Sequence, residues 1–350
     1  EKIVSVMREP FEVYSRQVFV SASLGVAVFP DDGTDTDTLL INADQAMYEV
    51  KKCLRNDYSF FTRELQQRSE ERHRVINKLA LAVAERRLEV HYQPIVPLDG
   101  SGKMGCEALV RWQEDGEYIS PDTFIPLAEE IGLITEIDRF VMQQATLFME
   151  SLHALGLPPP ALSVNISPRI FFDRVGELDR WVDDVKACSR RTDLTIEITE
   201  RLLTQDTPRA TVALQQLRAE GVKIAIDDFG TGYSSLSYLA KFPIDTLKVD
   251  AFFVSKIPDD AYAMTLTETI LGLGRELSLH MVAEGVETAE QMHYLRERGC
   301  DSAQGYWFSR PQPAAEFKSW LRSYYEALNS SGNSPATPSI ARLLTPPRHK

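Results

Sequence analysis

Hydrophobic and polar positions along residues 88–328 follow a repeated order of short apolar strands and longer amphipathic helices. Strands are predicted near 88–96, 104–112, 161–167, 194–200, 223–228, 246–250, 280–285 and 302–308. Helices are predicted near 121–131, 135–155, 175–190, 207–220, 233–240, 260–278, 287–298 and 313–327. Strands that alternate with helices over roughly 250 residues are typical of an α/β protein of the (β/α)₈, TIM-like barrel type.

The first two strands of this barrel are expected to run antiparallel. Only the segment from Pro97 to Lys103 connects them. A parallel pair needs a crossover of a dozen or more residues, usually a helix, whereas an antiparallel pair needs only a turn.

The rest of the chain divides into three further parts. Residues 1–63 form a small α+β segment, with a strand over 18–30, a helix over 39–52 and a last strand near 58–61. Residues 64–87 are charged and helical and lead into the barrel at 88–328. Residues 329–350 are rich in Ser and Pro, which predicts a disordered tail.

Composition restricts the class of protein. The net charge of −13 argues against binding of long nucleic acid through a basic face. No apolar run reaches the roughly 18 residues of a membrane span, so we expect a cytoplasmic chain, whose parent protein could still be anchored through upstream segments. The four cysteines lack metal-ligand spacing and are expected to be reduced thiols: Cys53, Cys106, Cys188 and Cys300.

Polar residues interrupt the strands near their carboxyl ends, where barrel enzymes hold their chemistry. Asp227 and Asp228 end one strand, and Lys248 lies between Leu247 and Val249 in the next. The two-residue period of a strand places further polar side chains on the inward face. These are Glu107, Arg111, Asn165, Glu197, Glu284 and Gln304.

Carboxylates that converge in this way need a counter-charge, because like charges and loss of water both disfavour the ionised form. Divalent metal removes both penalties, and an all-oxygen ligand set favours Mg²⁺ or Mn²⁺ over zinc. The adjacent Asp227 and Asp228 suit two ions roughly 4 Å apart, a recurring arrangement for phosphoryl displacement. Lys248 could then orient the attacking water or neutralise phosphate charge.

Each of these residues also has a purely structural explanation. Asp228 could be a turn residue, Glu107 an ion-pair partner, and Asn165 a ligand of backbone groups. Lys248 could extend to solvent, and Gln304 could belong to the barrel rim. Their joint placement at one barrel mouth favours a site.

Several motifs identify a resemblance. In chain order they are QPIV, EALVRW, VNIS, EITE, DDFGTGYSSL, LKVD, AEGVE and QGYWFSRP. Over residues 68–328 the chain resembles the EAL-domain cyclic-di-GMP phosphodiesterases. The resemblance implies hydrolysis of cyclic-di-GMP to linear pGpG with two Mg²⁺ or Mn²⁺ ions.

The resemblance also implies a role for each site residue. Glu107, Asn165, Glu197 and Asp227 would hold one metal ion, and Asp227, Asp228 and Glu284 the second. Lys248 would act on the attacking water, and Glu200 would steady the loop after Asp228. Substrate contacts would come from Gln93, Leu109 and Arg111, with Gln304 and Glu287 close by.

Residues 1–63 resemble the C-terminal half of a GGDEF (diguanylate cyclase) domain. The matching stretches are SASLGVAVFP, ADQAMYEVKK and RNDYSFFT, although Leu54 stands where that family usually has Gly. The GGDEF signature itself is absent, so this segment alone is expected not to cyclise GTP.

Two other functions and one assembly were considered. The barrel could be a non-catalytic cyclic-di-GMP receptor, or an unrelated carboxylate-pair enzyme such as a glycosidase. Asn165, Lys248 and the adjacent aspartates argue against the glycosidase. The EAL resemblance further implies a homodimer formed through the helix expected at 233–240, next to the loop after Asp228.

Overall fold

The computed structural model describes residues 2–7, 9–14, 16–53, 57–98, 103–172, 176–204, 208–230, 239 and 242–330. The chain forms two compact units, residues 1–81 and residues 82–350. Helix α3 (Arg63–Ala84) contains the boundary between them. No helix in the described ranges has the length and apolar character required to cross a membrane.

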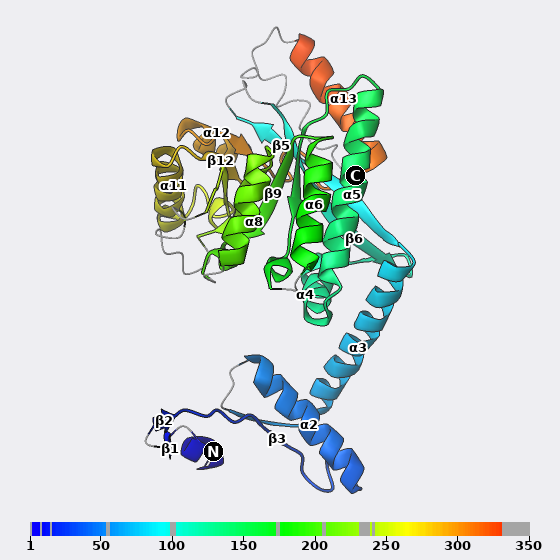
Figure 1. The fold of residues 1–350 in the computed structure, drawn as a ribbon, viewed down its shortest axis with the longest axis vertical. Helices are drawn as coiled ribbons and strands as arrows, with labels where there is room; N and C mark the ends of the chain where they lie inside the picture. The colour runs from blue at the N-terminus through cyan, green and yellow to red at the C-terminus, as the bar shows by residue number, and fades with distance from the viewer. Residues whose placement is uncertain are drawn as a thin grey trace. The chain divides into compact units, whose positions relative to one another are not determined.

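The N-terminal unit has small sheets and two helices before α3 (Figure 1). Its elements are α1 (Lys2–Met7), β1 (Phe11–Val13), β2 (Arg16–Val18), β3 (Leu24–Val26), α2 (Thr36–Cys53) and β4 (Tyr58–Phe60). Strands β1 and β2 form an antiparallel pair, and β3 pairs parallel with β4. Helix α2 approaches β3 so closely that a Cβ at Gly25 would lie 1.7 Å from the Ala43 carbonyl oxygen.

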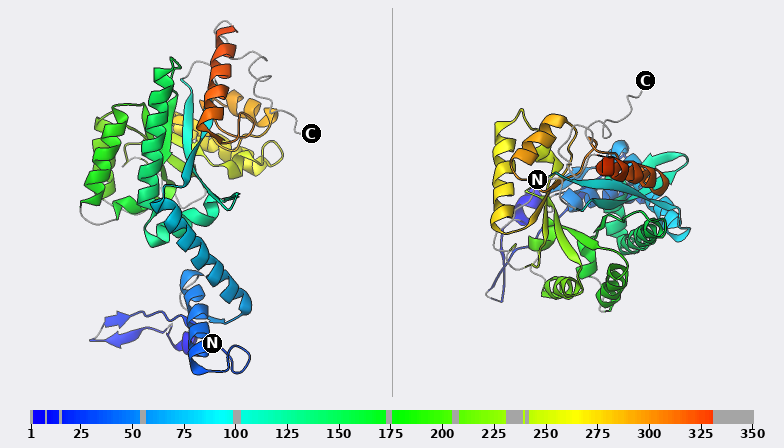
Figure 2. Two further views of the ribbon diagram at one scale, coloured as in Figure 1. Left: turned by 90° about the vertical axis from the view of Figure 1, so that its right-hand side faces the viewer. Right: turned by 90° about the horizontal axis from the view of Figure 1, so that it is seen from above.

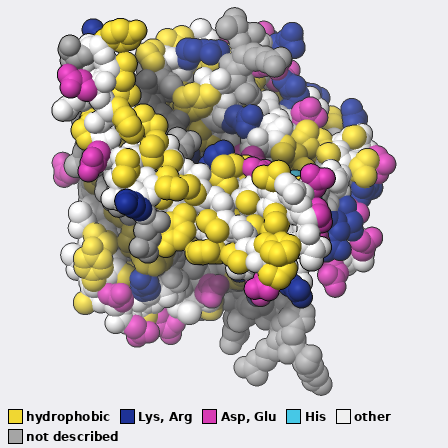
Figure 3. All heavy atoms as spheres, turned by 90° about the horizontal axis from the view of Figure 1, so that it is seen from below, with side chains coloured by type: hydrophobic (Ala, Val, Ile, Leu, Met, Phe, Trp, Pro, Cys, Tyr) yellow, Lys and Arg dark blue, Asp and Glu magenta, His cyan; other side chains and the backbone are white. Residues whose placement is uncertain are grey.

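Apolar side chains of this unit are largely exposed. Phe19 and Phe29 are 75% and 66% exposed, and Leu40 and Ile41 on α2 are 65% and 59% exposed. Figure 3 shows hydrophobic side chains over much of the face that it presents. The N-terminal unit therefore buries only a small core.

Eight strands in the described part of the second unit close into a mixed barrel. In order around the barrel they are β5 (Leu88–Pro97), β6 (Gly105–Glu114), β8 (Ala161–Asn165), β9 (Leu194–Thr199), β10 (Lys223–Phe229), β11 (Thr246–Val249), β12 (His280–Ala283) and β13 (Ser302–Ala303). Strand β5 runs antiparallel to both β6 and β13, and the other neighbours pair in parallel. The predicted barrel and its antiparallel first pair are confirmed.

Helices surround the barrel, as the view from above in Figure 2 shows. They are α4 (Pro121–Ile131), α5 (Ile134–Ala154), η1 (Pro168–Phe171), α6 (Glu177–Ser189), α7 (Glu200–Thr204), α8 (Pro208–Ala219), α10 (Ala251–Val254), α11 (Ala261–Glu276), α12 (Ala289–Glu297) and α13 (Ala314–Ser330). Short strands β7 (Glu117–Ile119) and β14 (Gln312–Pro313) extend the sheet beside β6 and β5.

Local sequence explains where the main helices begin. Pro121 opens α4, where its missing N–H costs no hydrogen bond. Asp260 accepts hydrogen bonds from the first turn of α11, and Thr288 with Gln291 forms a reciprocal cap on α12. Between strand and helix lies the core, in which Val164 and Ile196 are fully buried as the two-residue period predicts.

Two predicted strands differ most from the observed ones. The last barrel strand was expected over 302–308 but comprises only Ser302–Ala303. Gly305 lies against the backbone of Val286, whose oxygen would be 2.1 Å from a Cβ there, and the chain turns at this point. The strand expected over 18–30 is also interrupted, because residues 19–23 pair with no strand in the described part of the chain.

Some predictions lie outside the described residues. The helix expected at 233–240, with the dimer contact assigned to it, falls there except for Leu239, and so do residues 331–350 of the expected tail. Helix α13 continues through Ser330, past the expected start of that tail at residue 329. Cys106, Cys188 and Cys300 are buried free thiols, whereas the side chain of Cys53 is outside the description.

Candidate active site

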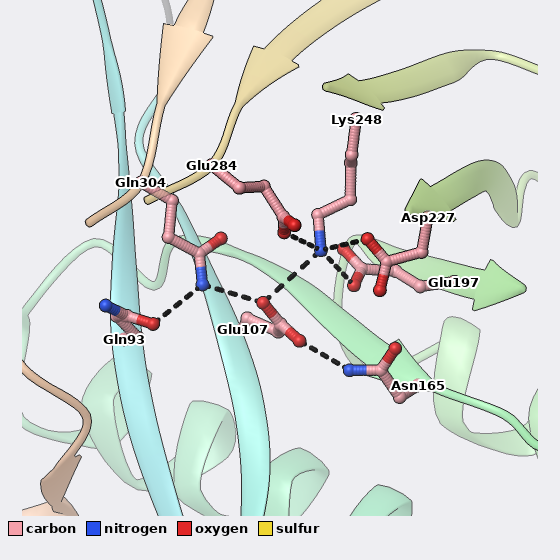
Figure 4. A network of polar contacts seen from close by, with 8 residues as sticks. All are labelled: Gln93, Glu107, Asn165, Glu197, Asp227, Lys248, Glu284 and Gln304. Carbon is pink, nitrogen blue, oxygen red and sulfur yellow. Dashed lines mark hydrogen bonds and ion pairs between the residues drawn. The ribbon is translucent and has the colours of Figure 1, made fainter. Parts of the chain in front are cut away.

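Lys248 on β11 lies at the centre of a buried polar cluster near the carboxyl ends of the strands (Figure 4). Its side chain is 1% exposed. Four carboxylates surround its Nζ atom, three from different strands and one, Glu284, from the residue after β12. The distances are 2.6 Å to Glu284, 2.7 Å to Glu197, 3.1 Å to Asp227 and 3.4 Å to Glu107.

The charges of this cluster do not balance. Burial alone would lower the pKa of Lys248, but the four carboxylates outweigh it and raise that pKa well above its ordinary value. Burial also raises the pKa of Glu284 to about 8 and that of Glu197 well above its usual range, despite their ion pairs with Lys248. One ammonium group therefore leaves an excess of negative charge, which favours the binding of cations.

Glu107 on β6 is held by two amide side chains. The Asn165 amide donates to Glu107 Oε1, and the Gln304 amide donates to Glu107 Oε2 at 2.7 Å. Gln304 Nε2 also lies 2.9 Å from the side-chain oxygen of Gln93, whose own amide donates to the Ser309 carbonyl at 3.1 Å. These contacts fix the orientation of the Glu107 carboxylate across three strands.

A second group of carboxylates lies at the end of β10. Asp227, Asp228 and Glu284 each offer an oxygen atom, and these atoms lie within 4.8 Å of one another. The β10–β11 pairing changes register between Ile226 and Phe229, and Asp228 has a left-handed φ of 55°. This irregularity breaks the strand alternation, so the two adjacent aspartates are not forced to opposite faces of the sheet.

The environment of Asp228 disfavours its ionised form. Although Asp228 is exposed at the surface, the surrounding protein still removes part of its water shell. This desolvation, the charge of Asp227 and a hydrogen bond with Asp250 raise the pKa of Asp228 to about 7. Asp250 also caps α10. Sequence patterns assign no functional role to Asp250.

The donor set fits divalent metal. All the available ligand atoms are oxygens, the chemistry that Mg²⁺ and Mn²⁺ prefer. Asp227 Oδ1 is buried and has no hydrogen-bond partner in the described part of the chain, although Lys248 Nζ lies 3.1 Å away. A buried oxygen in this state is suited to a cation.

Glu200 supports the backbone that follows Asp228. Its Oε2 atom accepts the Gly230 N–H at 2.8 Å. Gly230 has a φ of 101°, and a Cβ there would approach the Phe253 ring to 2.9 Å, so this position favours glycine. Residues 231–238 of the adjoining loop lie outside the description.

The remaining predicted residues are placed differently. Leu109 and Arg111 lie on β6 with Glu107 and are half-buried. Burial lowers the pKa of Arg111, and among the described residues no carboxylate forms an ion pair with it; Nη1 donates to the Val110 carbonyl. Glu287 is exposed, and among the described residues its side chain forms no hydrogen bond or ion pair with the cluster.

Asp138 on α5 is a buried carboxyl that sequence patterns did not reveal. It accepts the Ser167 N–H at 2.9 Å, and the Ser167 hydroxyl donates to Glu129 at 2.7 Å. These bonds hold the segment immediately after Asn165. Burial raises the pKa of Asp138 to about 8 from an ordinary value near 3.8.

We expect Asp138 to make barrel stability fall as pH rises from about 4 to about 8. The folded chain retains a proton that the unfolded chain releases, so each pH unit in this window costs up to about 1.4 kcal/mol. Asp138→Asn keeps an oxygen for the Ser167 N–H but removes the titration. Its stability relative to the unmodified chain should therefore increase from about pH 5 to about pH 8.

Urea unfolding followed by tryptophan fluorescence measures this change in the barrel alone, because Trp112, Trp181, Trp307 and Trp320 all lie in 88–328. The exposed Asp259, changed to Asn, serves as the control. Equal pH dependence in Asp138→Asn and the unmodified chain would contradict the assignment.

Fold and cluster together define an α/β barrel with a carboxylate-rich, metal-compatible site at the carboxyl ends of its strands. Comparison with known proteins agrees. The EAL domain family matches residues 76–311, and the diguanylate cyclase GGDEF domain family matches residues 1–57. The chain belongs to the EAL family, and part of a GGDEF domain precedes the EAL domain.

Similar proteins include two from Pseudomonas aeruginosa. The cyclic di-GMP phosphodiesterase NbdA is 37% identical over 93% of this chain and 42% of its own length. The bifunctional diguanylate cyclase/cyclic di-GMP phosphodiesterase MucR is 38% identical over 90% of this chain and 46% of its own length. The chain thus spans less than half of these relatives.

Solved structures show the same fold. A PaMucR phosphodiesterase structure, a c-di-GMP complex, superimposes with a TM-score of 0.64 at 38% identity. The match covers 70% of this chain and 99% of the solved chain.

Proposed function

We propose that this chain hydrolyses cyclic-di-GMP to linear pGpG with two Mg²⁺ or Mn²⁺ ions. The observation that carries the proposal is the buried Lys248 among four carboxylates, beside the Asp227–Asp228–Glu284 group. The relatives named as cyclic di-GMP phosphodiesterases support the choice of substrate.

The residues divide between the two ions by their positions. Glu107, Asn165, Glu197 and Asp227 would hold one ion, and Asp227, Asp228 and Glu284 the other. When bound, such ions supply Lewis acidity toward phosphate oxygen and water. To present its oxygen to an ion, the Asn165 amide would have to release or share its bond to Glu107.

Lys248 would hold the attacking water and oppose negative charge that develops on the phosphate. Its ammonium group remains protonated at neutral pH because the carboxylates raise its pKa. Lys248 is therefore assigned a hydrogen-bond donor and electrostatic role, and it does not serve as a general base.

The half-buried Arg111 is suited to the substrate phosphate, because it has no carboxylate partner in the described part of the chain. Gln93 and Leu109 line the same two strands and would contact the nucleotide. Gln304 would act by fixing Glu107. Glu287 is the weakest of the proposed substrate contacts, because its side chain is exposed.

The direct test incubates the chain with cyclic-di-GMP and Mg²⁺ or Mn²⁺ and separates the products by chromatography. We expect pGpG to accumulate only with metal. Saturable binding of cyclic-di-GMP without turnover in either metal would instead support the receptor function.

The N-terminal unit is expected not to make cyclic-di-GMP. Residues 1–57 match the GGDEF family but lack its signature sequence. Incubation of the chain with GTP and either metal should therefore yield no cyclic product. To prevent hydrolysis of any product, the assay uses Asp227→Asn; accumulation of cyclic-di-GMP would contradict the prediction.

A further inference from the structure

A pocket opens at the end of the barrel opposite to the candidate active site. Its volume is about 480 Å³, within the range of small-ligand sites. The wall includes the first residues of several parallel strands, among them Gly105, Ala161, Thr246 and His280. We call this cavity the amino-end pocket.

Small side chains form part of the wall of the amino-end pocket, beside the larger Ile95 and Val282. Barrels of this type usually have layers of bulky branched residues across the interior. Here the wall contains Gly105, Ser163, Thr195 and Ser302. A hollow therefore extends inward as far as Glu197, which lines its inner end.

Several hydroxyl groups in this pocket lack protein partners. Ser163 and Thr195 are each 7% exposed, and Thr246 is half-buried. Within the described residues, their hydroxyls form no hydrogen bond, and all three line the cavity. Buried hydroxyls normally have partners, so these groups are available to a ligand.

The charged side chains at the pocket entrance differ in whether a side chain of opposite charge pairs with them. Lys103 and Lys223 both pair with Asp193, at 3.0 and 3.2 Å. Asp245 pairs with Arg218 at 3.0 Å.

Asp301 has no Lys or Arg partner among the described residues. It accepts the Met281 N–H at 2.7 Å, and His280 Nδ1 lies 3.7 Å away. Asp301 therefore offers the ligand a negative charge that no permanent cation compensates.

We propose that the amino-end pocket binds a small polyhydroxylated ammonium compound, with the chemistry of an amino sugar. The ammonium group lies at Asp301, and ligand hydroxyls bond to Ser163, Thr195 and Thr246. A neutral sugar lacks the first interaction.

Occupation of the pocket also affects the catalytic cluster. Glu197 lines the pocket and lies 2.7 Å from Lys248. A ligand hydroxyl that donates to Glu197 competes with Lys248 for the same carboxylate. This effect on turnover rests on the proposed function, whereas binding to the pocket does not.

Isothermal titration of the whole chain with glucosamine tests the binding, and glucose serves as the matched neutral probe. We expect saturable millimolar binding of glucosamine and at least about tenfold weaker binding of glucose. Thr195→Val, which removes the hydroxyl at nearly constant shape, should weaken glucosamine about fivefold. Asp301→Asn, which still accepts the Met281 N–H, should weaken it about tenfold.

Thr265→Val on α11 is the matched control, because its hydroxyl bonds to its own helix and should leave glucosamine affinity unchanged. Ser163→Ala replaces Thr195→Val if that variant melts early. Absence of saturable heat up to tens of millimolar glucosamine, or undiminished affinity in the pocket variants, would overturn the site. Equal affinities for glucose and glucosamine would overturn the ammonium assignment.

Turnover of cyclic-di-GMP with saturating glucosamine tests the connection to Glu197. We expect kcat to fall at least about twofold in the unmodified chain, and the glucosamine concentration that gives half of this fall should be about fivefold higher in Thr195→Val. An unchanged kcat at full occupancy would show that the pocket binds ligand without affecting Lys248.

Discussion

Asp227→Asn is expected to lower turnover of cyclic-di-GMP about 10³-fold, because both proposed metal positions lose a charged ligand. Glu107→Ala removes a ligand of only one proposed metal position, and we expect a loss of turnover of similar size. In both cases excess Mn²⁺ should restore little activity, and EDTA should abolish the activity of the unmodified chain. Steady-state kinetics at several metal concentrations measure these effects.

The stability of Asp227→Asn distinguishes loss of a ligand from loss of the fold. Four carboxylates surround one ammonium group in the metal-free chain, so removing one negative charge should not lower the free energy of unfolding in EDTA. The exposed Asp259, changed to Asn, should alter neither activity nor stability. Full turnover by Asp227→Asn, or by the unmodified chain in EDTA, would refute the metal-dependent function.

Lys248→Ala is expected to lower kcat by on the order of 10² or more while cyclic-di-GMP still binds. The ammonium group is assigned to the attacking water and to charge that develops during the reaction, so its loss acts mainly on the chemical step. Affinity measured with Ca²⁺ in place of Mg²⁺ separates binding from turnover. Lys186→Ala, on the outer helix α6, is the control for loss of a lysine.

Lys248→Ala should lower the free energy of unfolding, whereas Asp227→Asn should not. Without metal, the variant leaves buried carboxylates unpaired, at a cost of roughly 3–5 kcal/mol before protonation of those groups relieves it. Divalent ions should recover much of this loss. A collapse of affinity with normal kcat would make Lys248 a substrate contact and contradict its assigned role.

Sequence patterns predicted the barrel because strand and helix periods are local properties. The inward face of each strand follows from a two-residue alternation, which placed Glu107, Asn165, Glu197 and Lys248 on one side. Their approach within hydrogen-bonding distance required only that the strands form one barrel. The family resemblance supplied the expected roles, which the geometry alone does not test.

Features that depend on distant contacts were not predictable. The last strand ends early because Gly305 lies against the backbone of Val286. A local pattern of apolar residues carries no information about this contact. In the sequence, Asp138 is an ordinary residue of a predicted helix. Its burial depends on packing beside Ser167. The amino-end pocket arises from small residues on several strands, none of which is unusual in its own segment.

The barrel closes where β13 meets β5, and this junction has a consequence for how the site is assembled. Only two residue pairs join the strands, yet the Gln304–Gln93 bond beside them links positions 211 residues apart in the chain. Closing so long a loop costs more entropy than closing the short β5–β6 connection, so we expect this contact to form late in folding and to open early in local unfolding. Because Gln304 also orients Glu107, the arrangement of the candidate site and the closed ring of strands are expected to form in the same late step.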